Sequence, residues 1–273
     1  MVNLRLPNFT ELPVDDEFVH LRGLGYDGSL NDMRFQSLAG DGAINDKLAT
    51  ATGDLYVWDF STNRFTDVDG TAVASDTDLV ARADSTGGVT FSQSTSGARA
   101  TANADGLIFN DGDYYTGSGA LTNLYEGIGD NTSAYEIRMV LSLGNVSTNQ
   151  YVFTLFNTEG ASNNHEVMYL RVQSGGVLRW LYEDVNSVSK NITTTGSNLQ
   201  TNTVYAIEFL KDGEDATLNI YEDGVGLVFS KDGTFNNGDF TPNLFTLGGL
   251  GRSVVNNHLL SNAEIHSFEV ELL

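Results

Sequence analysis

The chain has 273 residues, a net charge of −22 at neutral pH and no cysteine. A chain of this length has room for one domain of about 200 residues and a smaller module. The negative charge repels phosphate backbones, which argues against nucleic acid as a partner. Without cysteine the chain has neither disulfides nor thiolate metal sites.

Lysine is scarce in the sequence, whereas glycine, threonine, serine, asparagine and aspartate are common. This composition favours short strands joined by turns. Residues 1–5 lack the apolar core of a signal peptide, and no apolar run approaches the length that spans a membrane. We therefore expect a soluble protein that is made in a cytoplasm.

Residues 1–52 are predicted to form an N-terminal module. Two of the three prolines lie in residues 1–13, which favours an extended arm. The phrase Gly-Ser-Leu-Asn-Asp at residue 28 returns as Gly-Ala-Ile-Asn-Asp at residue 42, and each copy begins a short helical pattern. Helices this short are not stable alone, so we expect them to pack on one another or on a partner.

This N-terminal module is either a capping subdomain for the rest of the chain or a docking module for a larger assembly. Residues 18–33 resemble a segment that recurs in bacteriophage virion structural proteins. The resemblance implies docking on phage capsid or tail proteins, and the apolar positions expected to take part are Leu30, Phe35, Leu38, Ile44 and Leu48. Because these side chains have few local partners, we also expect a homo-oligomer, with a trimer as the first expectation.

Residues 53–273 have the pattern of a β-sandwich. Strand patterns occur at residues 55–60 and 79–82, and polar and apolar residues alternate from 135 to 143. Residues 151–156 are continuously apolar, as expected of a central strand. Further strands are predicted at residues 166–173, 177–184, 204–211, 216–222, 225–230, 245–249 and 267–273.

The hairpin at residues 166–184 permits a prediction of strand register. A three-residue loop at residues 174–176 places apolar side chains opposite one another on one face: Val172 and Leu178, Leu170 and Trp180, Met168 and Tyr182. The other face then holds Tyr169, Arg171, Arg179 and Glu183. We expect the charges on this second face to neutralise one another across the strands, so that they need no ligand.

Two further phrases resemble a known family. The group at residues 84–88, the later Gln93 and Arg99, and the run from residue 106 to 114 follow the order found at the entry to concanavalin A-like, laminin-G-type domains. Residues 260–265 resemble the turn before the final strand of laminin-G-like and pentraxin-like sandwiches, with Ser261 as N-cap and Glu264 as the capping-box acid. The resemblance spans residues 76–273 and implies an all-β, antiparallel jelly-roll β-sandwich.

No strand carries the alternating run of three acids that retaining glycoside hydrolases of this fold direct into a cleft. The single acids on strands are expected to be solvated: Glu166, Glu208, Glu222 and Glu269. The four histidines show no metal-binding spacing. We therefore expect no catalytic residue and no zinc site.

The rim loop of residues 110–115 is the predicted ligand surface. Asp111 and Asp113 offer oxygen ligands for calcium, which relatives in the laminin-G-like family hold at the sandwich rim, and a polar β-turn is the alternative interpretation. Asn110, Tyr114 and Tyr115 are predicted to bind sugar, because a pyranose presents C–H groups to an aromatic ring. Tyr125 and Tyr169 are lesser candidates, while Trp58 and Trp180 are expected in the core.

Together these features predict a non-enzymatic phage virion surface protein that docks by residues 1–52 and displays the sandwich outward. Capsid decoration, a head fibre and a tail adhesin for host-surface polysaccharide all fit this prediction. A secreted glycan-active enzyme or a bacterial lectin of the same fold is the alternative. The missing signal peptide and the missing row of carboxylates disfavour that alternative.

Overall fold

The structure, a computed structural model, describes residues 55–60, 78–80, 82–83, 89–103, 105–119, 122–157, 167–196, 198–236, 238–249 and 259–273. The N-terminal module and its docking positions Leu30, Phe35, Leu38, Ile44 and Leu48 lie outside the described residues. The division of the chain at residue 53 therefore stays a prediction.

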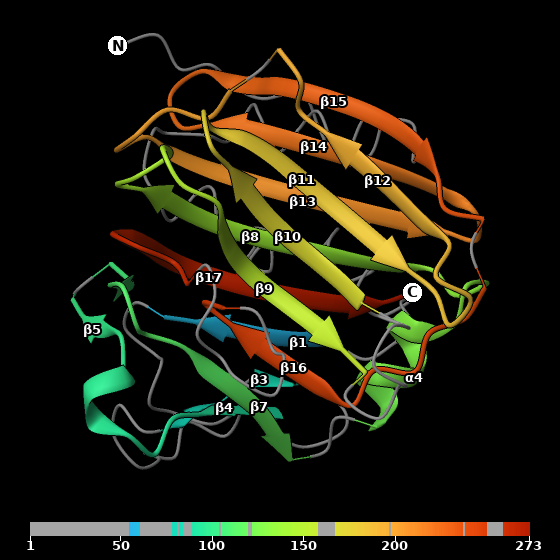
Figure 1. Cartoon of the computed structure of the whole chain (residues 1–273), viewed down its shortest axis with the longest axis horizontal. Helices are drawn as coiled ribbons and strands as arrows, with labels where there is room; N and C mark the ends of the chain where they lie inside the picture. The colour runs from blue at the N-terminus through green and yellow to red at the C-terminus, as the bar shows by residue number, and fades with distance from the viewer. Residues whose placement is uncertain are drawn as a thin grey trace, which may run out of the picture.

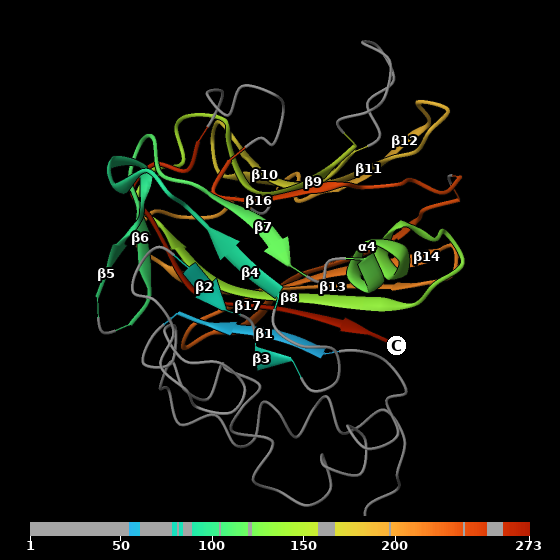
Figure 2. The same cartoon turned by 90° about the horizontal axis from the view of Figure 1, so that it is seen from below.

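Two antiparallel sheets lie face to face in the described part of the chain (Figures 1 and 2). Nine strands form one sheet, in the order β15 (Gly226–Thr234), β14 (Asp215–Glu222), β13 (Val204–Asp212), β8 (Tyr135–Leu143), β17 (Ala263–Leu272), β1 (Leu55–Asp59) and β3 (Arg82–Ala83), with β6 (Leu107–Phe109) paired to β17 and β5 (Thr101–Ala102) paired to β6. Eight strands form the other, in the order β12 (Ser189–Thr193), β11 (Val177–Glu183), β10 (Val167–Gln173), β9 (Gln150–Phe156), β16 (Leu244–Leu247), β7 (Tyr115–Gly119), β4 (Val89–Ser92) and β2 (Asp78–Val80). The predicted all-β antiparallel sandwich is confirmed.

The helix α4 (Thr122–Gly129) lies between the two sheets at one end of the sandwich (Figure 2). Leu124 and Ile128, one helical turn apart, are fully buried in the core and fix the helix there. The sequence did not predict this helix, because eight residues that include two glycines give a weak helical signal. No helix in the described ranges is long and apolar enough to cross a membrane.

The β10–β11 hairpin has the predicted register. Met168 lies opposite Tyr182, Leu170 opposite Trp180 and Val172 opposite Leu178. The loop between the strands has the three predicted residues, and Gly175 and Gly176 adopt φ values of 89° and 78°. Residues other than glycine rarely adopt this left-handed backbone conformation. The two glycines therefore favour a three-residue loop, and the loop length sets the register.

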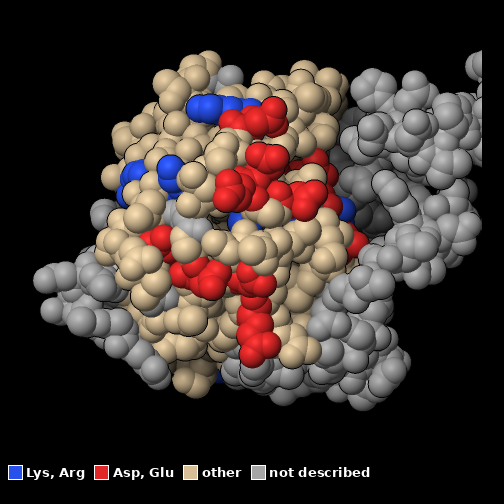
Figure 3. Space-filling view, turned by 90° about the vertical axis from the view of Figure 1, so that its right-hand side faces the viewer, with Lys and Arg blue, Asp and Glu red and all other residues tan. Residues whose placement is uncertain are grey.

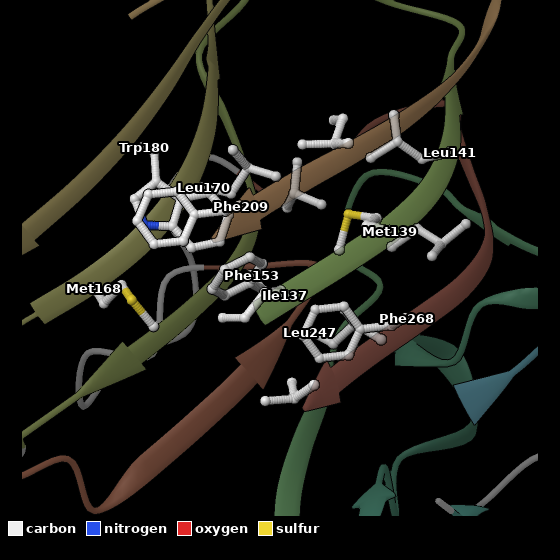
Figure 4. Close-up of a cluster of buried hydrophobic side chains, with 14 of the residues drawn as sticks. Ile137, Met139, Leu141, Phe153, Met168, Leu170, Trp180, Phe209, Leu247 and Phe268 are labelled. Carbon is white, nitrogen blue, oxygen red and sulfur yellow. The ribbon is translucent and has the colours of Figure 1, made fainter. Parts of the chain in front are cut away.

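Aromatic and aliphatic side chains from both sheets fill the core (Figure 4). Trp180 of β11 stacks on Phe209 of β13 in the opposite sheet, with ring centroids 3.9 Å apart and ring planes 6° from parallel. Trp58 is also buried, with 1% of its surface exposed. Both tryptophans thus lie in the core, as predicted. Full burial of a large apolar side chain stabilises the fold by about 1.5–3 kcal/mol.

The predicted capping box at residues 261–264 is wrong. Strand β17 begins at Ala263, which pairs with Leu143 of β8 and with Phe109 of β6. The Glu264 carboxylate accepts a hydrogen bond from the Asn103 side chain at 2.7 Å, and so does not cap a helix. Ladder hydrogen bonds to two neighbouring strands outweigh the single local bond that a cap would supply.

Candidate functional site

The predicted rim site is a turn between β6 and β7. Asp113 is 6% exposed, and its Oδ2 accepts a hydrogen bond from the backbone N–H of Asn110 at 2.7 Å. This carboxylate holds the turn together, while Asp111 is exposed. The loop has the geometry of the polar turn, and in the described ranges no group of three or more His, Asp or Glu side chains is placed to hold a metal ion. Calcium binding by Asp111 and Asp113 stays a prediction.

The two rim tyrosines differ in exposure. Tyr115 is fully buried and lies edge-on to Phe109, with ring centroids 6.0 Å apart, so the prediction that its ring stacks on a sugar is wrong. It opens strand β7 with its side chain in the core. Tyr114 is partly exposed and, with the exposed Asn110, remains a rim candidate.

A second apolar cluster lies apart from the main core, on the outward face of the eight-stranded sheet. This face points toward the viewer in Figure 1 and upward in Figure 2. The cluster joins three neighbouring strands and consists of Tyr151, Phe156, Val167, Tyr169 and Leu181. The rings of Tyr151 and Tyr169 meet edge to face, with centroids 5.0 Å apart. The five side chains are only 5–8% exposed, so they form a rigid support on the sheet rather than an open stacking surface.

Two arginines flank this aromatic pair. Arg171 of β10 lies directly opposite Arg179 of β11, and the same row continues to Tyr151 of β9 and to Thr193 of β12. The Arg171 guanidinium is 5.6 Å from the ring centroids of both Tyr151 and Tyr169, and it donates a hydrogen bond to the Tyr151 hydroxyl at 3.3 Å. The ring contacts therefore hold Arg171 in place from the protein side.

Neither arginine forms an ion pair with another described residue. The predicted neutralisation by Glu183 is wrong, because Glu183 lies opposite Val167, four residues along β11 from Arg179. That spacing is about 13 Å along a strand. The Nε atoms of both arginines are buried and have no hydrogen-bond partner. A buried donor without an acceptor costs about 1–3 kcal/mol, and like charges directly opposite destabilise a sheet.

The environment of Tyr169 reports the same positive charge. Burial raises the pKa of Tyr169, and the charges of Arg179 and Arg171 act against that rise. Both guanidiniums are thus close enough to influence one hydroxyl group. We call the group formed by Tyr151, Tyr169, Arg171 and Arg179 the arginine–tyrosine site. The sequence placed Tyr169 and both arginines on one face but did not identify them as a site.

The outward face of the nine-stranded sheet has the reverse arrangement. Arg138 of β8 forms ion pairs with Glu136, Glu269 and Glu271. Its side chain is 10% exposed, and those of the three glutamates are 9–14% exposed. The expectation that Glu208 and Glu269 are solvated is wrong, since Glu208 is 8% exposed and accepts a hydrogen bond from Asn219 at 3.0 Å. We call Arg138 and the four glutamates, Glu136, Glu208, Glu269 and Glu271, the Arg138 cluster.

The Arg138 cluster contains more carboxyl groups than its one guanidinium can neutralise. Burial raises the pKa of Glu136 to about 8; the charge of Arg138 opposes the shift, and the nearby Glu208 adds to it. Arg138 nevertheless contacts both carboxyl oxygens of Glu136, which favours the ionised form. Both observations fit a coupled pair in which Glu136 and Glu208 retain one proton to a higher pH than an isolated glutamate would.

Acidic side chains also gather at the end of the sandwich where β13 turns into β14 (Figure 3). Lys211 is buried behind them and donates hydrogen bonds to the carbonyl groups of Asn131 at 2.6 Å and Ser133 at 3.3 Å. Burial lowers the pKa of Lys211, and Asp130 and Asp212 counteract that effect. The lysine therefore supports the loop that precedes β8, and this end of the molecule presents negative charge to solvent.

No protein-family model matches the sequence, and no curated protein matches it. Among solved structures, a sialidase from Trypanosoma rangeli is 14% identical with a TM-score of 0.49; the match covers 79% of this chain and 30% of the sialidase. The CBM40 domain of the IT-sialidase from Ruminococcus gnavus is 12% identical with a TM-score of 0.46, over 61% of this chain and 89% of that domain. Similarity at this level concerns the β-sandwich fold alone.

Proposed function

We propose that this chain is a non-catalytic virion surface protein that docks on a phage particle by residues 1–52 and binds host-surface polysaccharide with its sandwich. The arginine–tyrosine site is the single observation that carries the binding function. It combines two partly exposed arginines that have no carboxylate partner with two buried tyrosine rings, each 7% exposed, that hold Arg171 in place. Both lie on strands of one sheet, which keeps their geometry fixed.

The virion part of this proposal has a separate basis. It rests on the resemblance of residues 18–33 to a segment of phage structural proteins and on the doubled phrase at residues 28 and 42. We propose Leu30, Phe35, Leu38, Ile44 and Leu48 as the docking positions, with phage capsid or tail proteins and further copies of this chain, as a trimer, as partners. In this proposal the protein is made in the host cytoplasm and ends at the virion surface.

Binding to immobilised surface polysaccharide from the host bacterium tests the first part. The full-length protein should bind, and Arg171→Gln should weaken binding more than the rim change Tyr114→Ala. Loss of binding in the rim variant alone would move the ligand to residues 110–115. No binding by the wild-type protein would reject carbohydrate recognition and favour capsid decoration.

Particle incorporation tests the second part. Mass spectrometry of purified particles should detect the full-length chain, and a truncated chain that starts near residue 53 should be absent from them. Circular dichroism of the truncated chain provides the control, because loss of incorporation is informative only if the sandwich still folds. Full occupancy of the truncated protein would contradict docking by the N-terminal module.

Glycan hydrolysis is the second candidate function, and the Arg138 cluster is the observation that favours it. Glycosidases pair a protonated carboxyl group with an ionised one, and Glu136 has the raised pKa that such an acid needs. The side chains of the cluster are 9–14% exposed and already bound to Arg138, which leaves little room for a substrate. Release of reducing ends from host polysaccharide by the wild-type protein, abolished by Glu136→Gln, would establish this function instead.

A further inference from the structure

We propose that the arginine–tyrosine site recognises a sugar that carries a carboxylate group, bound between Arg171 and Arg179. This inference rests on the proposed function, because it names the chemical class of the polysaccharide bound at the same site. Its physical basis is two partly exposed guanidinium groups that lie side by side without an anionic partner. The buried Nε atoms of both arginines have no partner, and no described carboxylate pairs with either guanidinium.

The geometry matches a carboxylate better than a neutral hydroxyl group. Directly opposite residues on neighbouring antiparallel strands have Cβ atoms about 4.5–5.5 Å apart, so the two guanidiniums start from one narrow stretch of the sheet. A carboxylate offers two acceptor oxygens and one negative charge, and guanidinium groups bind it with paired N–H bonds. The same anion would also remove the repulsion between the two positive charges.

The tyrosines supply the second half of the recognition. Tyr151 and Tyr169 both contact the guanidinium of Arg171, at 5.6 Å from each ring centroid. Tyr151 further fixes the orientation of Arg171 through its hydroxyl group. An arginine held in this way loses little side-chain entropy on binding, which favours affinity. Both arginines are partly exposed, so a ligand can reach them from solvent.

The net charge of the chain narrows the ligand class further. A protein with a charge of −22 repels a dense polyanion over distances comparable with the Debye length. Isolated carboxylates spaced along a mostly neutral polysaccharide avoid that penalty and still reach the local positive site. We therefore expect uronate-type sugars within neutral chains to bind, whereas heparin and polyphosphate should not.

Matched acid and ester sugars test this inference with the full-length protein. The probes are glucuronate and galacturonate glycosides, each beside its methyl ester, which retains the sugar ring and removes the charge. Saturation-transfer NMR and calorimetry should show about tenfold tighter binding of at least one acid than of its ester, the ratio expected for one charge-assisted pair. Arg171→Gln with Arg179→Gln should abolish this preference, and Lys231→Gln, which removes an exposed charge from β15 of the nine-stranded sheet, should retain it.

The possible results separate this inference from the proposed function. If host polysaccharide binds but each acid binds no better than its ester, the carboxylate inference is wrong and neutral glycan recognition survives. Failure of host polysaccharide and of every sugar to bind would reject both. An Arg171→Lys, Arg179→Lys variant guards against misfolding, because it keeps both charges. It should keep the wild-type melting temperature yet lose most of the acid preference, since ammonium groups cannot form the paired bonds. An unchanged preference in that variant would contradict the guanidinium geometry.

Discussion

The two outward faces of the sandwich use arginine in opposite ways. On the nine-stranded sheet, Arg138 contacts three glutamates, and a fourth carboxyl group lies within the same cluster. On the eight-stranded sheet, Arg171 and Arg179 lie side by side, and in the described chain no carboxylate pairs with either. One face has an excess of acids for its base, and the other has an excess of bases.

Charged side chains therefore have two roles here. The Arg138 cluster stabilises the fold, whereas Arg171 and Arg179 keep their positive charge available to a ligand. A buried ion cluster in which the protein supplies every partner resists removal of any one member. Like charges that the protein leaves without partners lower stability, and they remain available to an anionic ligand. Substitutions that give one face the property of the other, or remove its own, test this separation.

The largest effect is expected from removing Arg138. Arg138→Ala leaves its three glutamate partners without their counter-ion in a site of low exposure, and such a loss costs about 3–5 kcal/mol. The matched variant Arg171→Ala removes contacts with two tyrosine rings and should cost about 1 kcal/mol or less. Urea denaturation of both variants measures the contrast. Equal destabilisation by the two changes would contradict the assignment of separate roles to the two faces.

The pH dependence of stability should come next in size. Burial raises the pKa of Glu136 from 4.5 to about 8, so the folded state holds a proton that the unfolded state releases. This contribution to the free energy of unfolding is complete below pH 4.5 and declines as the pH rises through about 8. Replacing Glu208 with Gln removes the neighbouring like charge and should flatten that decline. Denaturation curves at several pH values compare the two proteins, and identical slopes would refute coupling between Glu136 and Glu208.

The sequence predicted most strands of the sandwich because their signals are local. Turn glycines and an apolar alternation fixed the β10–β11 register, and β8 runs over the predicted residues 135–143. The Arg138 cluster could not be predicted in the same way. Arg138 and Glu269 are 131 positions apart, and they meet only because β17 lies beside β8 in the sheet. Sheet order is a property of the whole fold, so acids that look isolated in sequence become partners.

At the rim and on the arginine face, too, the sequence predicted the local pattern but not the contacts that depend on neighbouring strands. The turn at residues 110–113 was visible from its composition, yet the inward direction of Tyr115 depends on β7 pairing with β16 and β4. The prediction that Arg171 and Arg179 share one face is confirmed, whereas the prediction that Glu183 neutralises them is wrong. A charge pattern along one hairpin gives the composition of a face, whereas its partners come from neighbouring strands and loops.

Adding a carboxylate to the arginine face should make it resemble the other face. Thr193 of β12 lies opposite Arg179, so Thr193→Glu offers that guanidinium an internal partner. Opposite charges in this position stabilise a sheet by about 0.2–1 kcal/mol. The same change should abolish any preference for acidic sugars, because the new glutamate competes for the site. Thr193→Gln serves as the neutral control in both measurements, and tighter acid binding by the Glu variant would overturn the competition argument.

The smallest expected effect is a gain in stability on removing Arg179. Arg179→Thr eliminates the charge opposite Arg171 and the buried Nε donor that has no partner, two terms that oppose folding. The variant also loses the packing of a long side chain, which offsets part of the gain. We expect the free energy of unfolding to stay level or to rise by about 0.5 kcal/mol, within the range for cross-strand pairs. Thermal and urea denaturation in the absence of sugar measure this change. A loss above about 1 kcal/mol would mean that the protein itself satisfies Arg179, and the case for an external carboxylate would then fail.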